Sequence, residues 1–152
     1  MYYRRLDYSK MVKGRHPIAA YEFLGPKLEG KDVILIDDMI SSGKSILEIA
    51  SLLKKRGAGK IFICTTFGLF TEGMEKFDEA YQNGIFDKLL TTNLVYQTPE
   101  LLSKPYYITC DMSKYIALII DTLNHDMSVS HLLNPADRIK RCVSNYMAQY
   151  EK

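Results

Sequence analysis

A run of apolar residues that stops at two adjacent carboxylates constrains this chain more than any other feature. Residues 33–36 read Val-Ile-Leu-Ile, Asp37 and Asp38 follow, and a Ser/Gly-rich stretch over residues 41–45 leads into a helical pattern. A short apolar run of this kind is typical of a buried strand, and small residues between a strand and a helix are typical of a βα loop. The segment therefore predicts a buried strand, an acidic edge and a loop that feeds a helix N-terminus.

The two ends of this segment attract different chemical groups. The open backbone N–H groups of such a loop, together with the helix dipole, attract a phosphate. Asp37 and Asp38 cannot bind a phosphate, but carboxylates hold sugar hydroxyls or a hydrated Mg²⁺, which prefers one or two carboxylates plus substrate oxygens. The segment therefore offers a phosphosugar matching chemistry at both ends. The plainer alternative is an ordinary βα loop in which Ser42 caps the helix.

Length and composition exclude several classes of protein. The chain has 152 residues, of which 47% are hydrophobic and 25% charged, which is ordinary for a soluble globular domain. A formal net charge of +2 gives no steering toward nucleic acid, and no apolar run approaches the length of a membrane span. The start of the chain has no signal-peptide pattern, and Cys64, Cys110 and Cys142 have no metal-type spacing. We therefore expect a cytoplasmic protein with buried, reduced thiols, and no nucleic-acid or membrane partner.

Strand and helix patterns alternate along the chain. Strands are expected at residues 17–23, 31–37, 60–66, 86–92 and 106–110, and helices at 46–53, 73–81, 115–123 and from Asn134-Pro135 onward. Asp111 is expected to cap the third helix, which should turn an apolar stripe inward, and Tyr106-Tyr107 is expected on the strand surface. The alternation predicts an α/β fold with three layers and a mainly parallel sheet. Ligands bind beyond the carboxyl ends of such strands, which is where Asp37 and Asp38 lie.

The segment from residue 33 to 45 resembles the phosphoribosyl-diphosphate-binding signature of type I phosphoribosyltransferases and of ribose-phosphate diphosphokinases. Residues 60–70, the stretch Leu90-Thr91-Thr92-Asn93 and residues 123–130 resemble further parts of that family, in the same order. The last of these favours the diphosphokinase branch. The resemblance runs from about residue 3 to 133 and implies a type I phosphoribosyltransferase-like fold.

The resemblance implies roles for individual residues. Asp37 and Asp38 would contact the ribose hydroxyls directly or through Mg²⁺, and the segment from Ser42 to Ser45 would hold the 5-phosphate. Two residues depart from the family pattern, because Ser41 stands where a third Asp is usual and Lys44 where Gly is common. Lys44 can add charge to the phosphate site or point outward. The substrate-binding candidates are Asp37, Asp38, Ser41, Ser42, Gly43, Lys44 and Ser45, and the metal candidates are Asp37 and Asp38.

The basic segment Tyr3-Arg4-Arg5-Leu6-Asp7-Tyr8 resembles the flexible catalytic loop of the diphosphokinases. In that loop a Lys-Arg-Arg triplet stabilises charge on the transferring group, which is the main catalytic device in phosphoryl-type transfer. Arg4 and Arg5 are therefore the catalytic candidates. The lysine is absent in either possible alignment, and lysine and arginine are not equivalent as phosphate clamps. The alternative is a basic N-terminal tail that is disordered in isolation.

The resemblance implies the C-terminal half of an enzyme of nucleotide biosynthesis. A complete ribose-phosphate diphosphokinase is a transferase that uses Mg²⁺ to convert ATP and ribose 5-phosphate into AMP and phosphoribosyl diphosphate. The ATP-binding half and the family's diphosphate-binding loop have no counterpart here. We therefore expect a fragment or the product of a truncated gene model, which binds ribose 5-phosphate or phosphoribosyl diphosphate and is inactive alone.

Three further expectations concern organisation and rival functions. Residues 1–14 are expected to form a partial catalytic-loop-like segment, residues 15–133 a phosphoribosyl-binding domain and residues 134–152 a C-terminal helix. A homo-oligomer is expected, because the missing half would normally cover part of the domain. A non-catalytic phosphoribosyl-binding regulatory or assembly paralogue, or a phosphoribosyltransferase domain, are the alternatives to a diphosphokinase half.

Overall fold

The computed structural model describes residues 2–6, 8–9, 11, 18–23, 25 and 27–150, and within 2–6 and 18–23 and at residue 150 only the backbone. The chain forms two compact units, Met1–Cys110 (unit 1) and Asp111–Lys152 (unit 2). Each unit is described below by itself. The expected boundaries after residues 14 and 133 stay a prediction.

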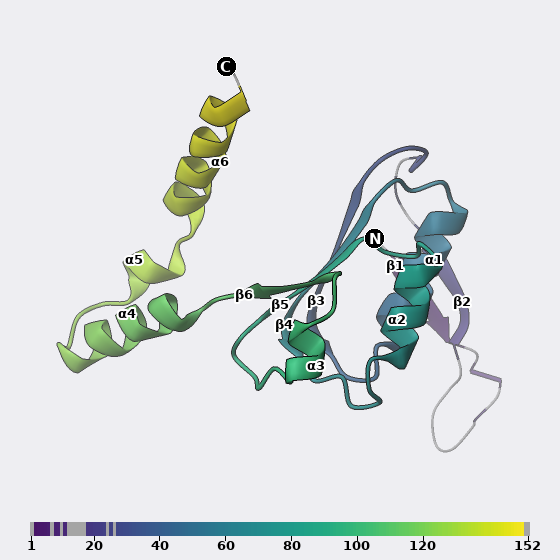
Figure 1. Cartoon of the computed structure of the whole chain (residues 1–152), viewed down its shortest axis with the longest axis horizontal. Helices are drawn as coiled ribbons and strands as arrows, with labels where there is room; N and C mark the ends of the chain where they lie inside the picture. The colour runs from purple at the N-terminus through teal and green to yellow at the C-terminus, as the bar shows by residue number, and fades with distance from the viewer. Residues whose placement is uncertain are drawn as a thin grey trace. The chain divides into compact units, whose positions relative to one another are not determined.

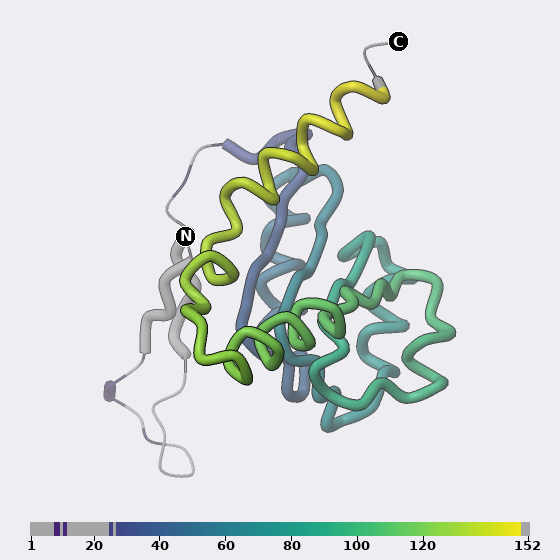
Figure 2. Tube along the Cα trace, turned by 90° about the vertical axis from the view of Figure 1, so that its left-hand side faces the viewer, coloured from purple at the N-terminus to yellow at the C-terminus, as the bar shows by residue number. Residues whose placement is uncertain are grey.

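Unit 1 is built on a four-stranded parallel sheet with the order β3-β4-β5-β6 (Figure 1). Its strands are β3 (Val33–Ile40), β4 (Ile61–Gly68), β5 (Lys88–Thr92) and β6 (Tyr107–Cys110). Figure 2 shows β3 and β4 running side by side. The predicted parallel sheet is thus confirmed, but the predicted end of the first of these strands at Asp37 is wrong. Pairing continues through Met39 and Ile40, which lie beside Phe67 and Gly68 of β4.

A separate two-stranded antiparallel sheet pairs β1 (Tyr2–Leu6) with β2 (Ile18–Phe23). The sequence predicts β2 but not β1, because residues 1–14 show no period. Backbone hydrogen bonds alone can hold such a ladder, so it need leave no trace in the side-chain pattern. Arg4 and Arg5 lie on β1, and their side chains are outside the described part of the structure.

Three helices of unit 1 accompany the parallel sheet, and α1 and α2 lie on the same side of it (Figure 1). They are α1 (Lys44–Lys55), α2 (Glu75–Gln82) and the short α3 (Pro99–Leu102). Their buried side chains form one core with Ile61 and Ile63 of β4. The sequence analysis does not predict α3, although Thr98 accepts a hydrogen bond from the Leu101 N–H and Pro99 follows it, a common helix start.

Unit 2 consists of α4 (Ser113–Asn124), α5 (Ser130–Leu133) and α6 (Ala136–Tyr150). The prediction that Asp111 caps α4 is wrong by one residue, because the cap is Met112; Asp111 instead accepts a hydrogen bond from the Ser113 N–H. Asn134 accepts one from the N–H of Ala136, the first residue of α6. The predicted inward stripe of α4 is wrong for most members, and apolar side chains of α6 are exposed as well. These exposed side chains are Ile116, Ile120, Leu123, Ile139, Val143 and Tyr146. Two long helices and one short one offer too few neighbours within the unit to cover them.

No helix in the described ranges is long and apolar enough to cross a membrane. The cysteines are free, but the prediction of buried thiols is wrong for Cys142, which is exposed on α6. Cys64 and Cys110 are half-buried. Cys64 alternates along β4 with Ile63 and Thr65, so it lies on the face away from the core. Burial and the nearby Cys110 raise the pKa of the Cys64 thiol.

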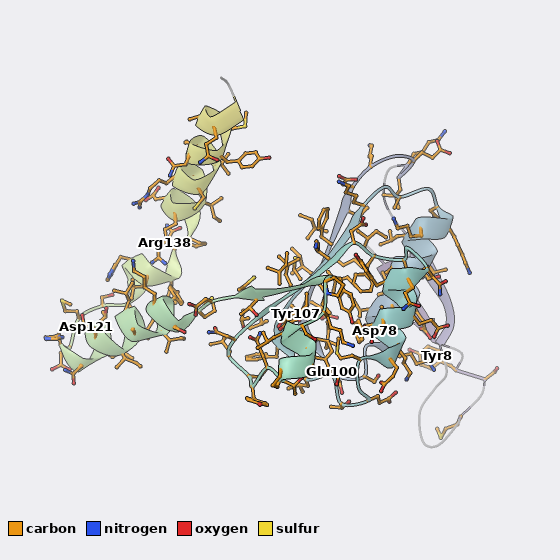
Figure 3. The ribbon with its side chains drawn as sticks, viewed as in Figure 1. Tyr8, Asp78, Glu100, Tyr107, Asp121 and Arg138 are labelled. Carbon is orange, nitrogen blue, oxygen red and sulfur yellow. The ribbon has the colours of Figure 1, made fainter. Side chains whose placement is uncertain are left out.

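Tyr106 is a core residue, which corrects the expectation that it lies on the strand surface. Its side chain is 1% exposed, and it precedes β6, so strand alternation does not govern where it points. The Tyr106 hydroxyl donates to Asp78 on α2 (2.7 Å), and Lys104 Nζ donates to the other oxygen of Asp78 (2.6 Å). Glu100 Oε1 lies 3.2 Å from Lys104 Nζ. Figure 3 labels Asp78 and Glu100, two members of this cluster. This cluster joins α2 to the segment between α3 and β6.

The ion pair sets the protonation of Asp78. Partial burial pushes the pKa of Asp78 up, but hydrogen bonds from Lys104 and Tyr106 and the Lys104 charge outweigh it, so that the pKa lies below its ordinary value. A lowered folded-state pKa stabilises the fold above the ordinary value of about 3.9, and this stabilisation is lost as the pH falls through the folded-state value. Burial and the bond to Asp78 also raise the pKa of Tyr106 above its usual range.

Asp78→Asn is therefore expected to lower the urea midpoint of unfolding at pH 7, and to differ less from the wild type as the pH falls below about 4. Glu100→Gln is the matched control, because the Glu100 side chain is 68% exposed and an exposed pair contributes little. An Asp78→Asn midpoint that lies below the wild type by the same amount at every pH would contradict this account.

Candidate functional site

The loop between β3 and α1 borders a cavity of about 350 Å³ at the carboxyl end of β3. Its lining runs from Asp37 to Ile46 without interruption. The structure therefore brings together every substrate-binding candidate that the sequence names. The catalytic candidates Arg4 and Arg5 cannot be placed against it, because their side chains lie outside the described part.

The helix end of the cavity presents backbone donors. The residue that caps α1 is Gly43, with a φ of 79°, and no side chain accepts a hydrogen bond at this cap. The alternative in which Ser42 is an ordinary helix cap is therefore wrong. No acidic side chain lies in the first turn of α1. Uncapped N–H groups at the positive end of a 12-residue helix suit an anion.

Phe77 of α2 packs against this loop at Gly43. A Cβ atom built on Gly43 would lie 2.3 Å from Cζ of Phe77, far inside contact distance. Phe77 itself is fully buried and packs edge-on against Phe70, with ring centroids 5.3 Å apart. The loop can rest on the aromatic ring only because residue 43 has no side chain. The sequence shows Phe77 as an apolar helix position but gives no signal of this contact.

The acidic end of the cavity consists of two exposed carboxylates. Asp37 Oδ1 accepts the backbone N–H of Asp38 (2.9 Å). Among the described residues, no three His, Cys, Asp or Glu side chains gather in a way that could hold a metal ion. A pair of exposed carboxylates does not make a closed metal site, but it fits Mg²⁺, which keeps several waters and takes substrate oxygens.

A second loop, between β4 and α2, is hydrogen-bonded to the loop between β3 and α1. The backbone N–H groups of Leu69 and Thr71 donate to the carbonyls of Ile40 and Ser41, at 2.8 and 3.0 Å. The hydroxyls of Ser41 and Thr71 lie 3.3 Å apart. Ser41 thus connects the two loops, and Thr71 is a contributor that the sequence analysis does not name. Its only sequence signal is its place just after a strand at the ligand-binding edge.

Lys44 occupies the first position of α1 and is exposed. It lines the cavity, as Asp37 and Asp38 do, and also a shallow groove between α1 and α2.

Comparison with known proteins gives a consistent picture. The family model described as phosphoribosyl synthetase-associated domain matches residues 9–134. The ribose-phosphate pyrophosphokinase of Vibrio parahaemolyticus is 26% identical over 107 residues, which is 70% of this chain and 33% of that protein. The ribose-phosphate pyrophosphokinase of Thermococcus kodakarensis is 36% identical over 93 residues, which is 59% of this chain and 31% of that protein.

Solved structures agree on the fold. The phosphoribosylpyrophosphate synthetase of Mycobacterium smegmatis superposes with a TM-score of 0.62 and 22% identity, covering 72% of this chain and 35% of that one. These matches confirm the type I phosphoribosyltransferase-like fold, and the chain spans about a third of the length of the curated relatives it matches. Because the family model matches most of its residues, this chain belongs to the phosphoribosyl synthetase-associated domain family.

Proposed function

We propose that this chain is the phosphosugar-binding half of a ribose-phosphate diphosphokinase and binds ribose 5-phosphate or phosphoribosyl diphosphate. One observation carries the proposal: the acidic pair and the uncapped N-terminus of α1 line the same cavity. Its volume of about 350 Å³ lies within the range of small-molecule sites, roughly 300–1,000 Å³. Membership of the family supports this choice over an unrelated phosphate ligand.

Each end of the phosphosugar has its partners. The N–H groups from Ser42 to Ser45, with the hydroxyls of Ser42 and Ser45, hold the 5-phosphate. Asp37 and Asp38 hold the ribose hydroxyls directly or through Mg²⁺, whose charge offsets that of the substrate oxygens. Arg4 and Arg5 would steady the transferring group in a complete enzyme. ATP would bind mainly outside this chain, which matches only a third of its relatives' length.

A second candidate is a non-catalytic phosphoribosyl-binding regulator or assembly partner in the cytoplasm. Ser41 favours it, because this residue offers a hydroxyl bonded toward Thr71 where a carboxylate would add to the acidic group. The site would be the same, and only turnover would differ. For the third alternative, a phosphoribosyltransferase domain, the named relatives give no support. Self-association stays a prediction.

Calorimetric titration with ribose 5-phosphate and MgCl₂ is expected to show one binding site per chain. Asp38→Asn removes a charge from the sugar end, and Ser45→Ala removes a hydroxyl from the phosphate end. Each is expected to weaken binding by about tenfold, since a hydrogen bond to a charged group contributes about 1.5–3 kcal/mol.

Glu29→Gln is the control for Asp38→Asn, because it neutralises an exposed carboxylate before the amino end of β3, at the opposite edge of the sheet. It is expected to leave the affinity unchanged. A folded wild-type sample that gives no heat of binding would refute the proposed function.

A further inference from the structure

Thr65 on β4 holds a buried hydroxyl that no described group satisfies. The residue is 6% exposed, and within the described ranges its Oγ1 is the one buried side-chain oxygen or nitrogen without a hydrogen-bond partner. The other buried threonines use their hydroxyls: Thr91 bonds to the Tyr107 hydroxyl, and Thr122 donates to the Leu118 carbonyl at 2.7 Å. An unsatisfied buried hydroxyl costs stability, so its presence calls for an explanation.

The position of Thr65 in the sheet points to its partner. In the parallel register Thr65 lies beside Asp37 on one side and Thr91 on the other. Residues in register on neighbouring strands point to the same face, about 4.8 Å apart, which is within reach of a side-chain hydrogen bond. Thr65 is thus next to one of the two carboxylates that line the cavity.

The other neighbour is already engaged. Thr91 Oγ1 bonds to the Tyr107 hydroxyl, which also accepts a hydrogen bond from Gln97 Nε2 (2.6 Å). Tyr107, labelled in Figure 3, lies on β6, the edge strand next to β5. Among the described residues, in contrast, Asp37 has one hydrogen-bond partner, the backbone N–H of Asp38, which donates to Oδ1. A carboxylate accepts several hydrogen bonds, and bonds to a charged acceptor are the strong ones.

We propose that Thr65 is a positioning residue of the phosphosugar site, whose hydroxyl donates to the Asp37 carboxylate when the acidic pair holds the ribose. The bond would fix the direction in which Asp37 presents its oxygens. Because Thr65 is buried and β-branched, its hydroxyl is held nearly rigid, which suits a positioning role. The inference rests on the proposed function and assigns a residue to it that is not in the loop or the acidic pair.

The rival explanation is that Thr65 only fills space. Valine has the same shape as threonine without the hydroxyl, so at a position that serves packing alone Thr65→Val would raise stability and leave binding unchanged. The two explanations therefore agree about stability and disagree about affinity. This makes Thr65→Val a direct test.

The experiment is a titration of the full chain with ribose 5-phosphate and MgCl₂, paired with thermal unfolding without ligand. Thr65→Val is expected to unfold at the same or a higher temperature than the wild type and to bind about tenfold more weakly. Thr65→Ser keeps the hydroxyl and loses a methyl group, so it is expected to unfold earlier but to bind within about threefold of the wild type. Thr122→Val is the matched control, since it removes a satisfied buried hydroxyl in unit 2 and is expected to lower stability without changing affinity.

Equal affinity of Thr65→Val and wild type would overturn the positioning role and leave the proposed function intact. Weak binding by Thr65→Ser would also overturn it, because the hydroxyl would then not be what matters, and this holds even if the valine variant fails to fold. Absence of binding by the wild type itself would overturn the proposed function and the positioning role together.

Discussion

Supplied with ATP, Mg²⁺ and ribose 5-phosphate, the purified chain is expected to release AMP at least about 10⁵-fold more slowly than a complete diphosphokinase. Positioning two reactants contributes roughly 7–11 kcal/mol to such reactions, and charge stabilisation adds to it. In the proposed function this chain, which spans a third of the length of its curated relatives, binds the phosphosugar but not ATP, so that only one of the two reactants is positioned. The N-terminal segment has Arg4 and Arg5 but no lysine beside them.

The measurement is AMP release followed by chromatography, with the Thermococcus kodakarensis ribose-phosphate pyrophosphokinase assayed in parallel. Asp38→Asn serves as the control for contamination, because activity that survives this change does not arise at the proposed site. Turnover of about 1 per second or more that Asp38→Asn abolishes would show that the chain catalyses the whole reaction, and it would refute the half-enzyme proposal. Binding without turnover fits both the half-enzyme and the regulatory candidate.

The sequence predicts the part of the site that one continuous segment of the chain forms. The apolar run, Asp37, Asp38 and the following small residues form a strand, an edge and a loop in the expected order, and the structure adds that they share one cavity. Local propensity is enough here because strand, loop and helix follow one another directly. The prediction ends β3 too early, because Met39 and Ile40 also pair with β4.

Contacts between distant residues explain what the sequence misses. Tyr106 reads as a strand residue, yet its burial depends on Asp78, which lies 28 positions earlier and gives the hydroxyl a partner. Ser41 meets Thr71 across 30 positions. In the sequence Thr65 looks like any other threonine of a strand. The strand register places it beside Asp37, and its buried hydroxyl has no partner among the described residues. Each of these relations is set by the packing of two elements, which no single-sequence pattern records.

The support of the loop by Phe77 predicts a large effect of Gly43→Ala. The change forces a side chain into the left-handed region, at a cost of about 1–2 kcal/mol, and drives its Cβ into a fully buried ring, which costs about 1–3 kcal/mol more. We expect a loss of about 3 kcal/mol in the free energy of unfolding. We also expect ribose 5-phosphate affinity to fall by more than about tenfold, because the N–H groups of the loop move away from their positions.

Gly84→Ala separates the two costs, because Gly84 also has a positive φ, of 65°, but no atom lies within 4 Å of a Cβ built there. Its free energy of unfolding is expected to fall only by the backbone part, about 1–2 kcal/mol, and its affinity for ribose 5-phosphate is expected to equal that of the wild type.

Phe77→Leu removes ring atoms that the new methyl group would meet. Gly43→Ala combined with Phe77→Leu should therefore lower the free energy of unfolding by at least about 1 kcal/mol less than the sum of the single changes. Urea unfolding of the four variants measures this difference. Strict additivity, or equal losses for Gly43→Ala and Gly84→Ala, would show that the loop does not rest on Phe77 and that backbone strain alone requires a glycine at the phosphate end of the cavity.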